Sequence, residues 1–175
     1  PDFPKEGIMF KDITPLLKDK EPFMEAIDSI KDNYKDVEID YIVGIESRGF
    51  IVGTPLAYAM EKGFIPIRKP GKLPADKITT SYDLEYGSNE LELHRDSIDK
   101  GDKVLIIDDL LATGGTVKAS CDLVEELGGD IVGIGFLLEL EDLNGREKLK
   151  GYDVFSLLKD WGIIYGIRAT YKSIK

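Results

Sequence analysis

An aliphatic run that ends in two carboxylates and a glycine-rich turn is the most informative chemical feature of the sequence. Residues 104–107 are aliphatic, Asp108 and Asp109 follow directly, and a turn with two glycines and two threonines precedes a predicted helix. Glycines let the backbone approach an anion closely, and the unpaired amides at the start of a helix bind phosphate. Two neighbouring carboxylates can accept hydrogen bonds from two ribose hydroxyls. The pattern therefore predicts a cradle for ribose 5-phosphate.

The predicted cradle extends from the end of the strand into the helix. Its residues are Asp108, Asp109, Ala112, Thr113, Gly114, Gly115 and Thr116. The alternative is an ordinary strand–turn–helix junction in which Thr116 caps the helix and the acids are solvated. Charge directly after a buried strand needs a partner, which favours a binding site. The turn lacks the Gly-Lys-Ser/Thr ending of a Walker loop, and no Gly-x-Gly-x-x-Gly follows a strand.

Residues 68–77 form a basic segment within an acidic chain. Four basic residues and one acid give this segment a local charge of +3, whereas the whole chain carries −10. Cations concentrated at one point of an acidic chain are suited to bind a highly charged anion. Arg68, Lys69 and Lys72 are therefore candidates for anion binding, and a solvated basic loop is the alternative. Arg48, after another predicted strand, is either a further anion contact or a surface side chain.

The rest of the chain alternates strands and helices. The predicted elements are a helix carrying the apolar stripe Phe23, Ile27, Ile30 and Tyr34, a strand at 39–45, a helix at 50–61 with its first turn near Pro55, a strand at 64–67, a hairpin at 79–85 and 90–94, a strand at 104–107, a helix at 116–127, a strand at 131–138, a short helix at 143–149 and a strand at 154–158. This order predicts an α/β fold with a parallel sheet flanked by helices. Ligands of such sheets bind beyond the carboxyl ends of the strands, where the cradle lies. The hairpin has little apolar content, so we expect it to bury little and to open easily, as lids do.

Length and composition limit the class of protein. With 175 residues, the chain suits one domain spanning residues 1–175. The net charge of −10 argues against nucleic acid as a partner, and the apolar runs are too short to span a membrane. Cys121 is the only cysteine, so no intramolecular disulfide is possible, which favours a reducing compartment. With His94 as the only histidine, a His/Cys zinc site is excluded in practice.

Five motifs in order along the chain resemble the type I phosphoribosyltransferase family, in the form found in its adenine-specific members. The motifs lie at residues 1–15, at 46–50, at 68–74 with 84–87, at 108–116, and at 143–146 with 155–158. The resemblance covers about residues 1–158 and implies a parallel sheet flanked by helices, with a small flexible hood at about residues 70–95. Residues 159–175 fall outside it, and we assign them no function.

The resemblance also implies roles for residues whose types alone are weak indicators. It implies that Glu85 is the catalytic acid/base, although an exposed hairpin glutamate is usually a solvated charge. Tyr86 would belong to the lid. Met9, Phe10 and Lys11 match the base-binding stretch, where Phe10 could stack on a purine or else pack in the core. The family often has arginine where this chain has Lys11, and lysine lacks the planar fork of arginine.

The implied reaction joins adenine to 5-phospho-α-D-ribosyl 1-diphosphate (phosphoribosyl diphosphate) and yields AMP and diphosphate. The family implies Mg²⁺ carried by the diphosphate with no dedicated protein ligand, and a homodimer in the cytoplasm. It also implies that Arg68, Lys69 and Lys72 bind the departing diphosphate, where fixed cations favour the transition state because negative charge develops on the leaving group. Arg48 would lie on the side of the base and diphosphate. Two alternatives remain open. One is a transferase for another purine, such as xanthine or hypoxanthine. The other is a ligand-sensing regulator, which would generally add a DNA-binding domain for which this chain has neither the length nor the charge.

Overall fold

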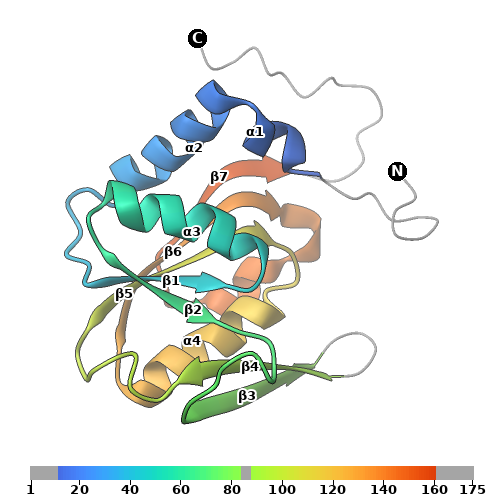
Figure 1. Cartoon of the computed structure of the whole chain (residues 1–175). Coiled ribbons are helices and arrows are strands. Elements are labelled where there is room, and N and C mark those ends of the chain that lie inside the picture. Colours follow the sequence, from blue (N-terminus) through green and yellow to red (C-terminus); the bar gives the residue numbers. More distant parts are fainter. Residues whose placement is uncertain (1–11, 84–87, 161–175) are drawn as a thin grey trace.

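The structure of the protein, a computed structural model, describes residues 12–83 and 88–160. Its elements in chain order are α1 (Thr14–Lys18), α2 (Lys20–Asn33), β1 (Tyr41–Ile45), α3 (Arg48–Ala59), β2 (Gly63–Ile67), β3 (Lys77–Asp83), β4 (Ser88–His94), β5 (Lys103–Leu111), α4 (Gly115–Leu127), β6 (Asp130–Leu140), the 3-10 turns η1 (Glu141–Leu143) and η2 (Gly145–Leu149), and β7 (Val154–Asp160). Figure 1 shows α1, α2 and α3 on one face of the central sheet, with α4 and the β3–β4 hairpin on the other.

The central sheet places the predicted chemical residues at one edge of the molecule. Its five strands lie in the order β2-β1-β5-β6-β7, and every neighbouring pair is parallel. Because β1 and β5 are adjacent, with Gly44 opposite Ile107, the segment that follows β1 meets the last part of β5, which runs on past Ile107 to Leu111. The turn after β1 therefore faces Asp108 and Asp109, although about sixty residues separate them in sequence.

Two apolar clusters, one on each face, hold β5 in place. Val104 and Ile106 belong to the cluster shared with α4, whereas Leu105 and Ile107 belong to the cluster shared with α2 and α3. All four are fully buried, because alternate side chains of a strand point to opposite faces and both faces are covered by helices. The continuous aliphatic run thus has a direct structural cause.

The prediction that the second helix begins near Pro55 is wrong. The helix α3 begins at Arg48, and Pro55 lies inside it. Proline has no N–H to bond the carbonyl four residues earlier, which belongs to Ile51. Ile51 is 43% exposed, so water can reach that side of the helix. Pro66 is also accommodated, since β2 is an edge strand, where proline is tolerated.

The expectation that the hairpin buries little is also wrong. Ile78, Leu91 and Leu93 are buried and belong to the same apolar cluster as Val117 and Leu123 of α4. Ile78 lies opposite Leu93 in the antiparallel register, so the two strands present one apolar face. The hairpin is therefore anchored to α4 along this face rather than lying loosely over the sheet.

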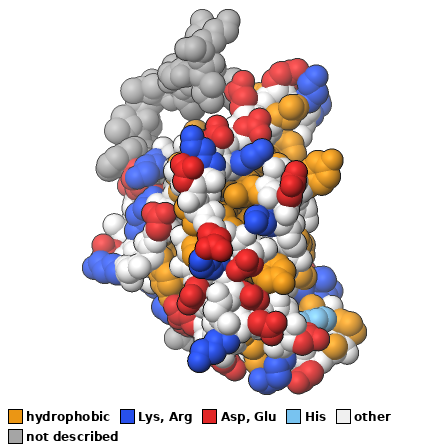
Figure 2. All heavy atoms as spheres, turned by 90° about the vertical axis from the view of Figure 1, so that its left-hand side faces the viewer, with side chains coloured by type: hydrophobic (Ala, Val, Ile, Leu, Met, Phe, Trp, Pro, Cys, Tyr) orange, Lys and Arg blue, Asp and Glu red, His pale blue; other side chains and the backbone are white. Residues whose placement is uncertain are grey.

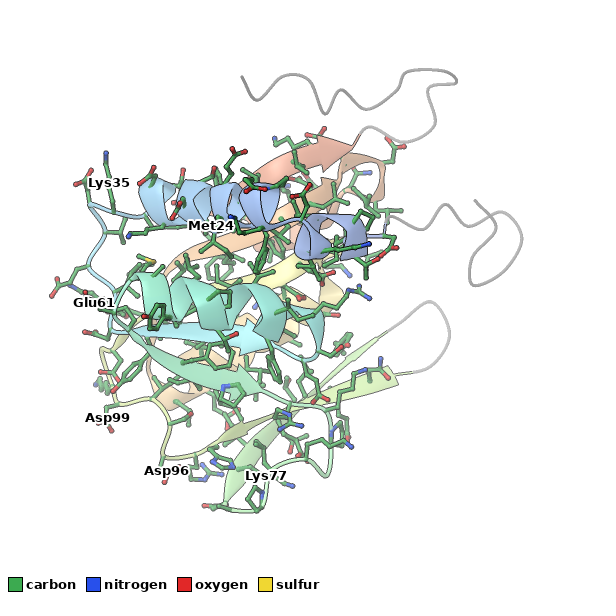
Figure 3. All side chains as sticks on the ribbon, turned by 45° about the horizontal axis from the view of Figure 1, so that its top comes forward. Met24, Lys35, Glu61, Lys77, Asp96 and Asp99 are labelled. Carbon is green, nitrogen blue, oxygen red and sulfur yellow. The ribbon has the colours of Figure 1, made fainter. Side chains whose placement is uncertain are left out.

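The outer surface mixes charges of both signs. Figure 2 shows acidic and basic side chains interspersed over one face of the molecule. In Figure 3, Met24 and Lys35 project outward from α2 and the segment that follows it, while Lys77 lies at the start of the hairpin. Among the described helices, none has the length and apolar character needed to cross a bilayer.

Candidate active site

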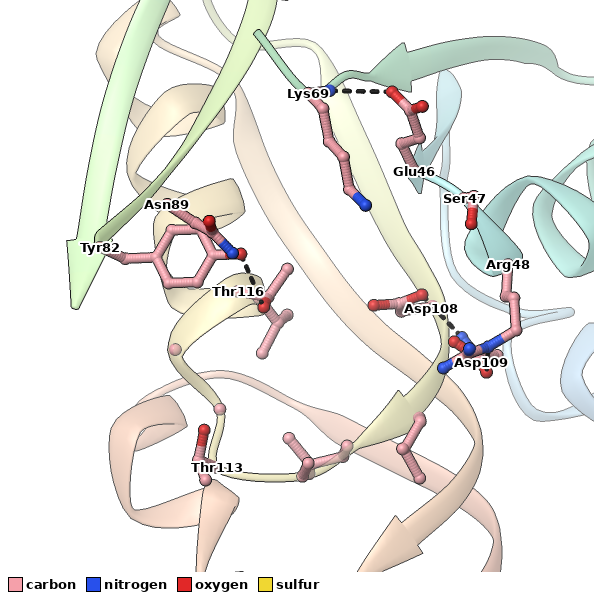
Figure 4. Close-up of a pocket in the computed structure, with 16 residues that line it drawn as sticks. Glu46, Ser47, Arg48, Lys69, Tyr82, Asn89, Asp108, Asp109, Thr113 and Thr116 are labelled. Atoms are coloured by element: carbon pink, nitrogen blue, oxygen red, sulfur yellow. Dashed lines mark hydrogen bonds and ion pairs between the residues drawn. The ribbon is translucent and has the colours of Figure 1, made fainter. Parts of the chain in front are cut away.

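A cavity of about 300 Å³ lies at the carboxyl ends of β1 and β5 (Figure 4). This volume is at the lower end of the range typical of small-molecule sites. Its lining comprises Glu46, Ser47, Arg48, Lys69, Tyr82, Asn89, Asp108, Asp109, Leu110, Leu111, Ala112, Thr113, Gly114, Gly115, Thr116 and Val117. The structure thus brings together every residue of the predicted cradle, together with Arg48 and Lys69. Arg68 and Lys72 are not part of the lining.

An ion pair joins the two strand ends beneath the cavity. The Nε of Arg48 donates to Oδ2 of Asp109 at 2.5 Å, and Asp109 is only 5% exposed. The start of α3 approaches β5 closely because Gly49 has no side chain. A Cβ at Gly49 would lie 2.9 Å from Oδ1 of Asp108 and 2.9 Å from the carbonyl oxygen of Ile107. The glycine after Arg48 is therefore what allows the guanidinium to reach Asp109.

Asp108 lines the cavity, and ionising its carboxyl group costs free energy. Burial raises its pKa well above the ordinary value of 3.8, and the neighbouring Asp109 raises it further. The backbone N–H of Asp109 donates to Oδ1 of Asp108 at 2.9 Å and offsets part of this effect. In Figure 4 the Asp108 carboxylate points into the cavity. An acceptor held in this way is suited to the hydroxyl groups of a polar ligand.

The turn after β5 exposes backbone donors to the cavity. Gly114 is the N-cap of α4 and adopts a left-handed conformation with φ of 77°, which glycine accepts without strain. No side chain caps this helix, and within residues 12–83 and 88–160 the amides of residues 113–116 have no hydrogen-bond acceptor. Thr116 lies inside α4, so the alternative in which it caps the helix is wrong. Donors at the positive end of a helix dipole are suited to bind an anion.

Glu46 holds the start of the basic segment against the cavity. Its Oε2 accepts from the backbone N–H of Lys69 at 2.8 Å and from Nε of Arg68 at 2.9 Å. Burial raises the pKa of Glu46, but these hydrogen bonds outweigh it, and the net pKa is lowered. Arg68 also lies over the ring of Phe50, 5.7 Å from its centroid. Figure 4 shows the Lys69 side chain extending into the cavity.

A second buried carboxylate anchors the rest of the basic segment. Oε2 of Glu92 accepts from the backbone N–H of Gly71 and pairs with Nζ of Lys77, each at 3.1 Å. Backbone bonds between Glu92 and Arg68 join the segment to β4. Two of the four cations in the segment are therefore already paired, Arg68 with Glu46 and Lys77 with Glu92. Lys72 is exposed and lies away from the lining.

The hairpin contributes two cavity residues that sequence reasoning missed. Tyr82 of β3 and Asn89 of β4 are opposite each other in the ladder and both line the cavity. The hydroxyl of Thr116 donates to the Tyr82 hydroxyl at 3.2 Å and so connects the hairpin to α4 (Figure 4). The only indication in the sequence was that Tyr82 is an aromatic residue in a largely polar strand. Its direction depends on the hairpin register, which the sequence pattern does not specify.

Five predicted site residues lie outside the described residues. They are Met9, Phe10, Lys11, Glu85 and Tyr86. Glu85 and Tyr86 fall between the described strands β3 and β4, the strands that bring Tyr82 and Asn89 to the cavity. Their roles remain predictions.

Comparison with known proteins gives this architecture a family. The sequence pattern of the phosphoribosyl transferase domain matches residues 15–168. Adenine phosphoribosyltransferase from Halothermothrix orenii is 71% identical over 160 residues, which cover 91% of this chain and 94% of that protein. The crystal structure of adenine phosphoribosyltransferase from Thermoanaerobacter pseudethanolicus matches with a TM-score of 0.89 at 53% identity, covering 91% of this chain and 93% of the other.

A more distant structure contains ligands. It is that of adenine phosphoribosyl transferase from Trypanosoma brucei in complex with AMP, pyrophosphate and ribose-5-phosphate. It matches with a TM-score of 0.83 at 29% identity and covers 91% of this chain and 74% of the other. The chain belongs to the phosphoribosyl transferase domain family. The family and the α/β fold class predicted from the sequence motifs are thereby confirmed.

The raised pKa of Asp108 predicts that Asp108→Asn stabilises the ligand-free protein at alkaline pH. A carboxyl with a raised pKa in the folded state contributes stability at low pH, and this contribution is lost as pH rises through that pKa. Asparagine does not titrate. The melting temperature of the variant should therefore exceed that of the unmodified protein at pH 8, and the difference should shrink as pH falls toward 4.

The matched control is Asp96→Asn, because Asp96 (labelled in Figure 3) is an exposed carboxylate that does not line the cavity. Its melting temperature should follow the unmodified protein at every pH. An Asp108→Asn variant that is less stable at pH 8 than at pH 5, relative to the unmodified protein, would contradict the assigned cost of ionising Asp108.

Proposed function

We infer that the chain is an adenine phosphoribosyltransferase, which converts adenine and phosphoribosyl diphosphate into AMP and diphosphate. The observation that carries this inference is that one cavity holds both the Asp108–Asp109 pair and the amides at the start of α4, which have no acceptor among the described residues. A sugar phosphate needs hydrogen-bond donors for its phosphate and acceptors for its hydroxyls, and this cavity has both. The similarity to enzymes of that name supports adenine as the base.

The cradle holds the ribose 5-phosphate part of the substrate. The backbone amides of residues 113–116 and the hydroxyl of Thr113 donate to the phosphate oxygens. The hydroxyl of Thr116 also donates to the phosphate once it exchanges its hydrogen bond with Tyr82 for one to the ligand. Ala112, Gly114 and Gly115 leave room for the phosphate, since none has a side chain larger than a methyl group. Asp108 and Asp109 accept from the ribose hydroxyls.

The basic residues serve the diphosphate. Lys69 extends into the cavity, and Arg48 lies beside it in the lining. Arg68 and Lys72 lie outside the lining, so they act on the departing group only if ligand binding draws them in. Negative charge grows on the diphosphate as its bond to the sugar lengthens. Cations fixed at that position stabilise the transition state more than the ground state, and this difference lowers the barrier.

The residues that bind and deprotonate the base are those that the family resemblance assigns, and they lie outside the described part of the chain. Met9, Phe10 and Lys11 bind adenine, with the Phe10 ring stacked on the purine. The bond from the sugar carbon to the diphosphate oxygen breaks, and a bond to a ring nitrogen of adenine forms. Glu85 takes the proton from that nitrogen. Tyr86 and the hairpin exclude water, which would otherwise attack the cation-like sugar.

The residues of the cavity fit a magnesium ion that enters with the substrate. Within the described residues, no cluster of three or more His, Cys, Asp or Glu side chains could hold a metal. Mg²⁺ typically binds through phosphates and water, with only one or two carboxylates. Three carboxylates of the lining, Glu46, Asp108 and Asp109, outnumber its two cations, Arg48 and Lys69, so the diphosphate needs a further positive charge. Mg²⁺ would supply that charge when bound, and Asp108, whose carboxylate points into the cavity, would be the residue that faces it.

The proposal includes a homodimer in the cytoplasm. The family resemblance supports the dimer, as do Met24, Ile51 and Tyr58, which are 56%, 43% and 89% exposed on α2 and α3 and could be covered by a partner. Cys121 is buried and is the only cysteine, so nothing in the chain requires an oxidising compartment. The net charge of −10 supports small molecules rather than nucleic acid as partners.

The activity is tested by mixing the purified protein with magnesium, phosphoribosyl diphosphate and one purine at a time. We expect AMP from adenine, with kcat/KM at least about 100-fold above that for hypoxanthine or xanthine. A site that hydrogen-bonds one substituent rejects analogues that lack it. Efficient conversion of a 6-oxo purine would replace adenine as the substrate. Binding of phosphoribosyl diphosphate without any turnover would favour the regulator instead.

The Glu85→Ala variant should lose about 10²-fold or more in kcat, and full turnover would remove its assigned role.

The two lysines of the basic segment provide a matched pair of variants. Lys69→Ala should raise the KM for phosphoribosyl diphosphate roughly 10-fold or more, because a hydrogen bond to a charged group contributes about 1.5–3 kcal/mol. Lys72→Ala should have a smaller effect, since Lys72 is exposed and outside the lining. Steady-state kinetics with each substrate varied in turn would measure this. Equal effects of the two substitutions would contradict the ranking by geometry.

A further inference from the structure

The turn between β5 and α4, residues 112–114, is called the phosphate turn below. It packs against a segment that has no role in the proposed reaction. The 3-10 turn η2 (Gly145–Leu149) follows β6, and its first residue packs backbone to backbone against the turn. A Cβ at Gly114 would lie closer than 3.0 Å to the carbonyl oxygen of Gly145, and one at Gly145 would lie closer than 3.0 Å to the carbonyl oxygen of Ala112. Gly145 is buried. The position of Gly145 therefore determines where the phosphate-binding amides lie.

Arg146 ties this supporting segment to the sheet. Its Nε and Nη2 donate to the two carboxylate oxygens of Glu139 at 2.6 and 2.8 Å, in a bidentate pair. Its Nη1 donates to the carbonyl oxygen of Val154 at 2.9 Å, and Nη2 also reaches Oγ of Ser156 at 3.3 Å. One guanidinium thus joins η2 to both β6 and β7.

The Glu139–Arg146 pair is better suited to fixing geometry than to adding stability. Glu139 is 3% exposed, and burying a carboxylate costs free energy that an ion pair only partly returns. The planar fork of arginine fixes both distance and direction, which the point charge of lysine does not. Because Gly145 directly precedes Arg146, fixing the guanidinium also fixes the backbone of Gly145, which contacts the turn.

We propose that Arg146, held by Glu139, is a positioning residue for the 5′-phosphate, acting through the contact of Gly145 with the phosphate turn. It touches neither substrate nor reacting atoms, and it is not part of the cavity lining. Its effect is confined to the alignment of the amides at the start of α4. The inference rests on the proposed function, because it assumes that these amides bind the phosphate of AMP and of phosphoribosyl diphosphate.

The test compares the dissociation constants of AMP and adenosine, measured by calorimetry. The ratio of the two isolates the contribution of the phosphate. In Gly145→Ala, Arg146→Lys and Glu139→Gln this ratio should fall roughly 10- to 100-fold, since small misplacements of a positioned group have effects of this size. The affinity for adenosine should stay unchanged, and the KM for phosphoribosyl diphosphate should rise while the KM for adenine does not.

Two control variants separate positioning from general destabilisation. Arg95→Lys alters a guanidinium that pairs with Asp76 on the surface, at 56% and 80% side-chain exposure. Gly151→Ala places a side chain at φ of 100° with no atom within 4 Å, so it carries a backbone cost away from the turn. Neither should change the ratio, even where the melting temperature falls.

Arg146→Lys and Glu139→Gln keep the size of the side chain, so they decide the outcome if Gly145→Ala does not fold. Variants that lower the melting temperature but keep the ratio would overturn the inference and leave a structural role only. An unmodified protein that binds AMP no more tightly than adenosine would overturn the proposed phosphate site, and this inference with it. Loss of the ratio in both Arg146→Lys and Arg95→Lys would also overturn it, because the effect would then not depend on the contact with the turn.

Discussion

The backbone amides at the start of α4, which have no acceptor among residues 12–83 and 88–160, are the constraint on which the rest of the proposed site depends. Their direction is set by the end of β5, which is held between two apolar clusters, and by the left-handed Gly114. In the proposed function, an anion at this point meets groups that folding has already oriented, so little ordering is needed when the ligand arrives. Asp108 and Asp109 can bind the ribose hydroxyls only if the phosphate of the same ligand is held at these amides.

Charge in the cavity is largely compensated before any ligand binds. Arg48 pairs with Asp109, Arg68 with Glu46, and Lys77 with Glu92. The first two pairs hold the segments after β1 and β2 against the end of β5, and the third joins β3 to β4. Lys69 is left extending into the cavity. An acidic chain can accommodate a highly anionic substrate in this way if the substrate brings its own divalent cation. Burial and the neighbouring Asp109 raise the pKa of Asp108, so the ionised form of this carboxylate costs the fold stability.

The local features of the fold could be predicted from sequence, and the long-range ones could not. Four consecutive aliphatics before Asp108 indicated a strand covered on both faces, and the Gly114–Gly115 pair indicated the turn. In contrast, Tyr82, Asn89 and Gly145 reach the site only through the packing of the hairpin and η2 on α4. Periodicity carries no information on such contacts. The start of α3 was misjudged for a related reason, since Pro55 is tolerated because of which side of the helix faces water.

The most direct test of this account is an amide ¹⁵N NMR titration of the ligand-free protein with ribose 5-phosphate, using ribose as the comparison. The account predicts that ribose 5-phosphate shifts the amide signals of residues 113–116 more than any others, and that ribose alone leaves them unchanged. Shifts centred elsewhere, or equal shifts with ribose, would contradict the claim that the start of α4 is a phosphate site.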